Sequence, residues 1–166
     1  MTTVPQTLKY ILENQPRFLN VNYDVSIITS SGSDVSFIEA REGVKVRVVD
    51  MKRKPSIFSD LISLYRLTRV FFKIKPDIVH SYTPKAGLLT MIAAAFVGVR
   101  VRIHTFTGLI FPSLKGFSRA LLITTDKLTS YCATVVVAES QRVRDDLAAV
   151  SVPCNDIRFI GPGNLA

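Results

Sequence analysis

The segment from Pro76 to Pro112 constrains the fold of this 166-residue chain more than any other stretch. It begins with an apolar strand, Asp77–Ser81, continues through a helix of almost only apolar residues, Pro84–Val97, and returns to a second strand, Arg100–Thr105. A helix that is apolar on every side has to be covered by other elements. The pattern therefore predicts a strand–helix–strand unit with parallel strands and an enclosed helix.

The rest of the chain continues this alternation. Further strands are predicted at Asp24–Thr29, Val44–Val49, Thr134–Ala138 and Asp156–Ile160, and further helices from Pro5 and over Asp34–Ala40, Ser56–Lys73, Leu114–Tyr131 and Ser140–Ala149. Short strands separated by helices are typical of a parallel sheet with helices on both faces. We therefore predict one α/β domain over residues 1–166, a Rossmann-like doubly wound sheet, in which Met1–Val4 is only the stub of a first strand.

Composition fits a folded domain and favours an anionic partner. With 48% hydrophobic and 20% charged residues, the chain lacks the signature of disorder. The net charge of +8 favours nucleotide phosphates, acidic lipid head groups or nucleic acid, although a solubility preference explains it equally well. Basic residues are not interleaved with aromatic ones as in nucleic-acid-binding domains, so no nucleic acid is expected.

The cysteines and histidines do not form a metal-binding pattern. Cys132, Cys154, His80 and His104 lack the spacing of a zinc site, so no metal is expected. The absence of a disulfide framework and of a signal-peptide pattern predicts a cytoplasmic location. The longest apolar run, Ala86–Val99, is shorter than the roughly 20 residues that a membrane-spanning helix needs.

Polar residues gather where the first strand of the central unit ends. In parallel α/β folds, ligands bind beyond the carboxyl ends of the strands, which is where His80 lies. Thr83 is a candidate cap for the following helix. The backbone amides of Lys85, Ala86 and Gly87 would then lack intrahelical partners and form a positive helix end suited to an anion or a sugar hydroxyl. Gly87 would allow a ligand or backbone to come close.

The second strand of the unit delivers His104, Thr105, Thr107 and Gly108 to the same edge. An imidazole at this edge could act as a base, an acid or a ligand of a sugar hydroxyl. A structural histidine, bonded within the fold, is the alternative for His104 and equally for His80.

A third strand end adds Glu139 and Ser140, which either contact a ligand or cap the next helix. Other signals of function are missing. No G-x-G-x-x-G follows a strand, and neither a Walker A sequence nor a G-x-S-x-G elbow is present.

Residues 76–87, PDIVHSYTPKAG, and residues 103–109, IHTFTGL, resemble the N-terminal domain of family-4 retaining glycosyltransferases of the GT-B architecture. The similarity is greatest to enzymes that build bacterial capsular polysaccharides or exopolysaccharides. The starting TTVP, Gln15, the basic loop Met51–Lys54 before a long helix, and the Ala138–Ser140 region also fit. The resemblance covers nearly the whole chain.

The resemblance implies that this chain is the acceptor-side half of a two-domain enzyme, without the C-terminal donor-binding domain and with the first strand largely missing. Such an enzyme moves a sugar from a nucleotide-sugar donor to a saccharide or lipid-linked acceptor at the inner membrane face, and it needs no metal or other cofactor. The residues expected to bind the acceptor are His80, Thr83, Lys85, Gly87, Thr105, Gly108, Glu139 and Ser140.

Two residues are candidates for a catalytic role. Thr107 stands where many members of the family have a histidine near the reacting sugar, and His104 lies three residues earlier. Because this histidine position is changed, the helix start Thr83–Gly87 is a stronger candidate for the site than either histidine.

Two other functions remain open at this point. One is a nucleotide-sugar 2-epimerase, which shares the GT-B architecture, and the other is a stand-alone domain that binds an anionic ligand or membrane. The segment Phe111–Leu122 could lie against an anionic membrane or be an ordinary surface helix. The residues expected on its membrane side are Phe111, Leu114, Phe117 and Leu121, with Lys115 and Arg119 near the head groups.

Overall fold

The computed structural model describes residues 1–52, 56–152 and 157–159. Residues 53–55 of the predicted basic loop and both ends of the predicted last strand lie outside these ranges. The strands are β1 (Ser26–Thr29), β2 (Lys45–Val48), β3 (Ile78–Ser81), β4 (Val101–Phe106), β5 (Val135–Ala138) and β6 (Ile157–Phe159). The helices are α1 (Pro5–Tyr10), α2 (Gln15–Leu19), α3 (Val35–Glu42), α4 (Ile57–Ile74), α5 (Pro84–Val97), the 3₁₀ turn η1 (Phe111–Ser113), α6 (Gly116–Cys132) and α7 (Gln141–Ala149).

The predicted alternation of strands and helices is confirmed, although some elements begin one or two residues later than predicted. The helix predicted from Leu114 begins at Gly116 instead. The chain first forms the turn η1, and Leu114 and Lys115 are extended, with ψ angles of 159° and 163°. An extended residue cannot continue a helix, so the two elements are separate.

All strand pairs are parallel, but the ladder is interrupted once. The hydrogen-bonded sheets are β1–β2 and β3–β4–β5–β6. The first residues of the chain lie between them: the Thr2 amide donates to the Ile28 carbonyl at 3.1 Å, and the Met1 amino group donates to the His80 carbonyl at 2.6 Å. The Tyr82 amide donates back to the Met1 carbonyl at 3.2 Å. Residues 1–3 thus hold the place of a strand between β1 and β3, but they are too few to form a full ladder.

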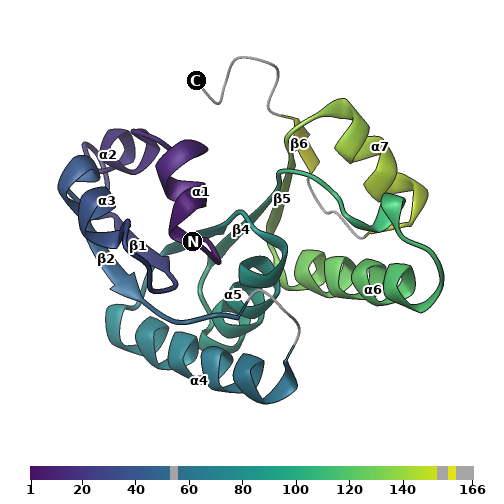
Figure 1. Ribbon diagram of the computed structural model, residues 1–166, viewed down its shortest axis with the longest axis horizontal. Helices are drawn as coiled ribbons and strands as arrows, with labels where there is room; N and C mark the ends of the chain where they lie inside the picture. The colour runs from purple at the N-terminus through teal and green to yellow at the C-terminus, as the bar shows by residue number, and fades with distance from the viewer. Residues whose placement is uncertain (53–55, 153–156, 160–166) are drawn as a thin grey trace.

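Helices cover both sides of the strands (Figure 1). One layer contains α4, α5 and α6 side by side, and α1 and α3 lie together on the opposite side. A large apolar cluster fills the space between α4, α5 and the four-stranded sheet, and a smaller one lies under α1 and α3. Within the described residues, no helix combines the length and the apolar character that crossing a membrane requires.

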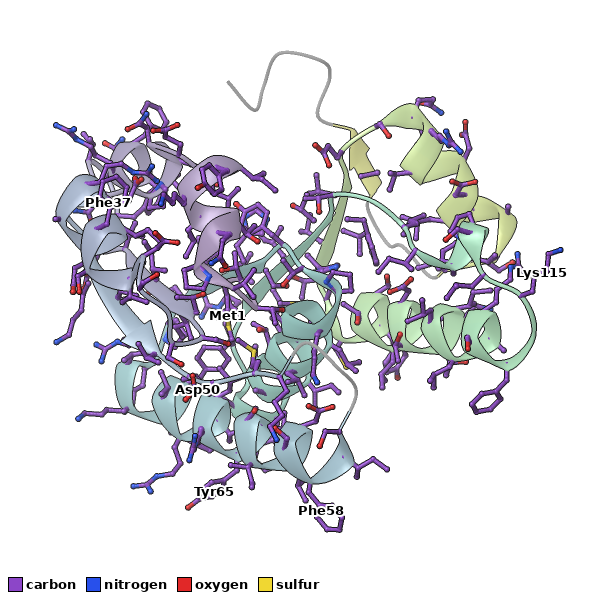
Figure 2. All side chains as sticks on the ribbon, viewed as in Figure 1. Met1, Phe37, Asp50, Phe58, Tyr65 and Lys115 are labelled. Carbon is purple, nitrogen blue, oxygen red and sulfur yellow. The ribbon has the colours of Figure 1, made fainter. Side chains whose placement is uncertain are left out.

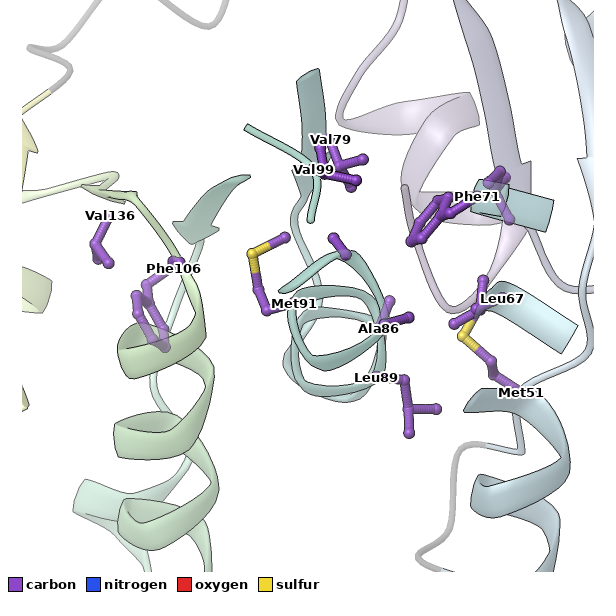
Figure 3. Packing of buried hydrophobic residues seen from close by; sticks show 14 of the residues in the cluster. Met51, Leu67, Phe71, Val79, Ala86, Leu89, Met91, Val99, Phe106 and Val136 are labelled. Carbon is purple, nitrogen blue, oxygen red and sulfur yellow. The ribbon is translucent and has the colours of Figure 1, made fainter. Parts of the chain in front are cut away.

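Helix α5 is enclosed as its sequence predicts (Figure 3). Ala86, Ala93 and Ala94 are fully buried, and such small residues let neighbouring helices approach closely. Leu67 and Phe71 of α4 pack on one side of α5 in the same cluster, with Phe106 of β4 on another. The helix therefore supports its own first turn rigidly at the carboxyl edge of the sheet.

A buried carboxylate shapes the lobe formed by α1, α2 and α3. The Glu42 side chain accepts hydrogen bonds from the backbone amides of Asn14 and Arg17, both at 3.2 Å, and pairs with Arg41 at 2.8 Å. A buried charge is tolerated only when it is paired and hydrogen-bonded in this way. These bonds fix the start of α2 and therefore the place of Gln15, which reaches the candidate site.

Candidate functional site

The two histidines lie on opposite faces of the sheet, although their strands are neighbours. His80 faces α2: its Nε2 lies 2.8 Å from Thr105 Oγ1 and its Nδ1 lies 3.0 Å from the Tyr82 hydroxyl. The rings of His80 and Tyr82 stack with centroids 4.1 Å apart. His104 instead faces α5, because side chains alternate along each strand. The two imidazoles therefore do not converge on one ligand.

The hydrogen bonds around His80 run in one direction. The Tyr82 hydroxyl donates its single proton to Gln15 Oε1 at 2.9 Å, so it must accept a proton from His80 Nδ1. His80 Nε2 is then an acceptor for the Thr105 hydroxyl. Both nitrogens of the ring are thus used within the protein. Burial lowers the pKa of His80 to about 3 and raises that of the Tyr82 phenol, so both groups stay neutral.

His104 joins β4 to α5. Its Nδ1 lies 2.8 Å from Ser81 Oγ, its ring meets Phe106 edge-on, and the residue is 1% exposed. A Cβ atom added at Gly87 would lie 2.7 Å from Nδ1 and 3.0 Å from Nε2 of this ring. Gly87 therefore makes room for a histidine of the fold rather than for a ligand. A catalytic role for His104 would require this side chain to be uncovered.

The first turn of α5 is bonded differently from the prediction. The Gly87 amide donates to the Thr83 carbonyl at 2.6 Å, and the Ala86 amide donates to the Thr3 hydroxyl at 3.2 Å. Thr83 does not cap the helix with its own side chain. Its hydroxyl lies 2.6 Å from that of Thr3 and accepts the Thr3 amide at 2.9 Å. The Gly87 amide therefore has an intrahelical partner, contrary to the prediction. The Ala86 amide has none in the helix, as predicted, but Thr3 occupies it, so it is not open to a ligand.

Lys85 lies at the same turn but points toward α4. Its ammonium forms an ion pair with the Asp60 carboxylate at 2.6 Å, and both side chains are largely buried. The pair links the first turn of α5 to the first turn of α4.

A cavity of about 360 Å³ opens next to the end of β4. Gly108, which the sequence analysis singled out, forms part of its wall, whereas Arg142 and Asp146 of α7 were not predicted there. Both would have been detectable from the sequence, because they lie one turn apart on a helix that starts at a strand end. The residues that line the cavity are Gly108, Leu109, Pro112, Ser113, Arg142, Val143 and Asp146.

The remaining predicted site residues lie around this edge. The Ser140 hydroxyl accepts the Val143 amide at 3.3 Å and so caps α7, as the capping alternative predicted. The Glu139 amide donates to the Phe106 carbonyl, which places Glu139 beside the end of β4. Thr107 is half-buried, and its hydroxyl makes a long contact of 3.5 Å to the Tyr82 carbonyl.

The segment Phe111–Leu122 does not present the apolar side that was predicted. Phe111 is buried, with the guanidinium of Arg119 over its ring, and Leu114 is half-buried. Phe117 and Leu121 are exposed. Phe111 lies in η1, Leu114 follows it in extended backbone, and Phe117 and Leu121 lie on α6, so the four residues do not form one membrane-facing stripe.

The fold and the strand-end geometry agree with the comparison to known families. The Glycosyl transferase 4-like domain matches residues 17–163. The chain belongs to this family. The resemblance inferred from the motifs at residues 76–87 and 103–109 is thereby confirmed.

Two relatives of known function are similar in sequence. The capsular polysaccharide biosynthesis glycosyltransferase CapM of Staphylococcus aureus is 34% identical over 166 residues, which are 99% of this chain and 43% of CapM. The UDP-Gal:alpha-D-GlcNAc-diphosphoundecaprenol alpha-1,3-galactosyltransferase of Escherichia coli is 34% identical over 98 residues, 58% of this chain and 25% of that enzyme. This chain spans less than half the length of either relative.

Solved structures support the fold. HepE of Anabaena, in complex with UDP, superposes with a TM-score of 0.73 at 14% identity and covers 98% of this chain and 43% of its own. A putative UDP-N-acetylglucosamine 2-epimerase from Listeria monocytogenes gives 0.69 at 16% identity, covering 95% and 42%. At such identities the likeness shows the fold alone. The prediction of one Rossmann-like half of a GT-B fold is confirmed.

The contact between His104 and α5 predicts a stability effect at Gly87. Gly87→Ala adds a methyl group that overlaps the imidazole, which Phe106 and Ser81 hold from behind. We expect a loss of about 1–3 kcal/mol in the free energy of unfolding, measured by urea denaturation. Gly108→Ala is the control, since a Cβ there meets nothing within 4 Å. Equal stability of the two variants would contradict the packing.

The buried histidines predict acid sensitivity of the fold. Burial lowers the pKa of both His80 and His104 to about 3, so the unfolded chain binds more protons between pH 6.5 and 3. We expect their contribution to stability to be complete above pH 6.5 and to be lost as the pH falls toward 3. Burial raises the pKa of Asp126 to about 7, which acts in the opposite direction between pH 3.8 and 7. Urea titrations of Asp126→Asn should therefore show a steeper loss, and a pH-independent stability would contradict the assignment.

Proposed function

We propose that this chain is the N-terminal, acceptor-side domain of a retaining glycosyltransferase of bacterial surface polysaccharide synthesis. The full protein would transfer a sugar from a nucleotide-sugar donor to a saccharide or lipid-linked acceptor. The carrying observation is that the family motifs at residues 76–87 and 103–109 end together at the carboxyl edge of β3 and β4, beside a cavity. The similarity to the E. coli galactosyltransferase, whose name includes a diphosphoundecaprenol-linked substrate, supports the lipid-linked form of the acceptor.

In this proposal, the site residues have two kinds of role. Direct contact with the acceptor is assigned to side chains at the outer edge of the site. Positioning is assigned to the buried groups behind them, which hold the strand ends and the start of α5. The contacting residues are Thr107, Gly108, Glu139, Ser140, Arg142 and Asp146, and the positioning residues are Gln15, His80, Thr83, Lys85, Gly87, His104 and Thr105.

The role of this domain in the reaction is to orient the acceptor hydroxyl toward the donor. Holding two reactants in a reactive geometry lowers the barrier by making the encounter intramolecular. A carboxylate and a guanidinium, as at Asp146 and Arg142 on the α7 wall of the cavity, can accept from and donate to sugar hydroxyls. Binding of the nucleotide, retention of configuration and independence from metal are proposed from the family and assigned to the missing part of the enzyme. The site of action would be the cytoplasmic face of the membrane.

A transfer assay with the full-length protein tests this function. We expect the longer protein to transfer labelled sugar from a UDP-sugar to a lipid-linked acceptor, and residues 1–166 alone to transfer none. Turnover by the isolated fragment would contradict the division of roles. Conversion of the UDP-sugar to its 2-epimer without transfer would contradict the proposed reaction and support the epimerase alternative.

The cavity predicts different effects for two arginines of the same helix. Arg142 lines the cavity, whereas Arg144 is an exposed residue of α7 outside it. We expect Arg142→Ala to lower kcat/KM for the acceptor by about 10- to 100-fold, as the loss of charged hydrogen bonds would, without changing Tm. Arg144→Ala should leave both values unchanged. Equal effects of the two substitutions would remove the cavity from the site.

A further inference from the structure

Helix α6 carries a row of mostly apolar residues that the described part of the chain leaves exposed. Figure 1 shows α6 at one end of the helix layer that also contains α4 and α5. Figure 2 shows Lys115, which precedes the first residue of α6, projecting at the edge of the molecule. We call the row the α6 stripe, and its members are Phe117, Leu121, Thr124, Leu128 and Tyr131.

The spacing of the α6 stripe is that of a contact between two helices. Its members follow one another at intervals of four, three, four and three residues. This average interval of 3.5 residues keeps side chains on one narrow side of a helix, and it is the repeat by which paired helices pack along their length. From Phe117 to Tyr131 the stripe is about 21 Å long, at 1.5 Å per residue. It contains no charged residue.

The buried residues of α6 are polar. They are Asp126, Thr129 and Ser130. Ser130 Oγ is buried without a hydrogen-bond partner among the described residues, and burial raises the pKa of Asp126 to about 7. A surface helix normally directs its apolar side inward and its polar side to solvent. The second half of α6 has the reverse pattern, so covering its outer side would remove exposed apolar surface from water.

The α6 stripe is complementary to itself. From either end it reads as an aromatic residue, a leucine, Thr124, a leucine and an aromatic residue. When two copies of α6 pack antiparallel with Thr124 at the crossing point, Phe117 of each copy meets Tyr131 of the other. In the same way, Leu121 of each copy meets Leu128 of the other. Every contact then occurs twice, as the two-fold symmetry of a homodimer requires.

Charge favours the antiparallel arrangement of the two copies. Lys127 lies at the border of the stripe, directly before Leu128. Antiparallel pairing places the two copies of Lys127 about 9 Å apart along the helix axes, whereas parallel pairing would place them at the same height. Because the chain has a net charge of +8, two copies repel each other in general. A contact surface without charge allows them to approach.

We propose that the α6 stripe is the contact surface of a homodimer in which two copies of α6 pack antiparallel across a two-fold axis at Thr124. Stable protein interfaces of standard size bury about 1,600 Å², and one pair of short helices buries less. The dimer is therefore expected to be reversible, with a dissociation constant in the micromolar range. The inference goes beyond the proposed function and does not depend on it, because association is measured without sugar transfer.

Sedimentation velocity of the full-length protein over a range of concentrations tests the dimer. We expect a monomer–dimer equilibrium that depends on concentration. Thr124→Lys places two like charges on the two-fold axis and should raise the dissociation constant at least about tenfold. Thr124→Val has a similar shape without the charge and should leave the dimer intact. The double variant Leu121→Ser, Leu128→Ser should weaken the dimer at least about tenfold through its reduced apolar area.

Phe58→Ser is the matched control for Phe117→Ser. Both phenylalanines have 83% of their surface exposed, but Phe58 lies on α4, away from the α6 stripe (Figure 2). Phe58→Ser should dimerise as the unchanged protein does, whereas Phe117→Ser should dimerise more weakly. Circular dichroism shows whether each variant is folded. A dimer that the α6 variants leave intact would overturn the proposal, and so would a protein that stays monomeric well above micromolar concentration.

Two results would assign the α6 stripe to a different occupant. If the full-length protein is monomeric and Thr124→Lys lowers its Tm, the stripe packs against another part of the same chain. If the protein is monomeric and sediments with anionic vesicles unless Thr124 is replaced by lysine, the stripe contacts a membrane. Either result would overturn the homodimer.

Disulfide cross-linking tests the position of the two-fold axis. Cysteines introduced at position 124 of the two copies would face each other across the axis. Oxidised Thr124→Cys should therefore form more covalent dimer than the oxidised unchanged protein. Ser118→Cys is the control, because Ser118 is exposed on α6 but would lie about 18 Å from its counterpart along the antiparallel helices. Stronger cross-linking of Ser118→Cys than of Thr124→Cys would contradict the antiparallel arrangement.

Discussion

The structure depends on the enclosure of α5, a helix without a polar side. Burying its apolar surface is the main favourable contribution available to this unit, and it requires neighbours on every side. Alanine residues at 86, 93 and 94 bring α4 and the strands close, and α6 completes the layer. Because α5 cannot tilt or shift within this packing, the ends of β3 and β4 and the first turn of α5 form one rigid edge. The candidate site is built on that edge.

The polar groups nearest to α5 mainly form hydrogen bonds with one another, which hold the strand ends and the start of α5 together. Ser81 and His104 bond each other beneath Gly87, and Thr3 bonds both Thr83 and the Ala86 amide. Buried polar groups without partners are costly, so these pairs are what allows hydroxyls and an imidazole to lie in the core. What remains for a ligand is the outer layer around Gly108, Arg142 and Asp146.

Much of the fold was predictable, because periodicity reports directly on burial. The strand–helix–strand unit, the parallel pairing and the cap at Ser140 follow from local patterns. The site was predictable only as a region. Two residues at adjacent strand ends appear equivalent in sequence, yet a difference of one position decides the face to which each side chain points. His80 and His104 differ in this way.

The sequence by itself determined the class of the protein. The alternation of apolar strands and helices specified a Rossmann-like domain, and the motifs at residues 76–87 and 103–109 specified the glycosyltransferase family. The tertiary structure alone decided which polar groups form hydrogen bonds within the fold and are therefore not available to a ligand. The stretch PDIVHSYTPKAG looked like an open helix start, but Thr3 bonds to Thr83 and Ala86, which lie 80 and 83 residues away in sequence. Such a contact depends on how distant segments meet, and no local pattern records it.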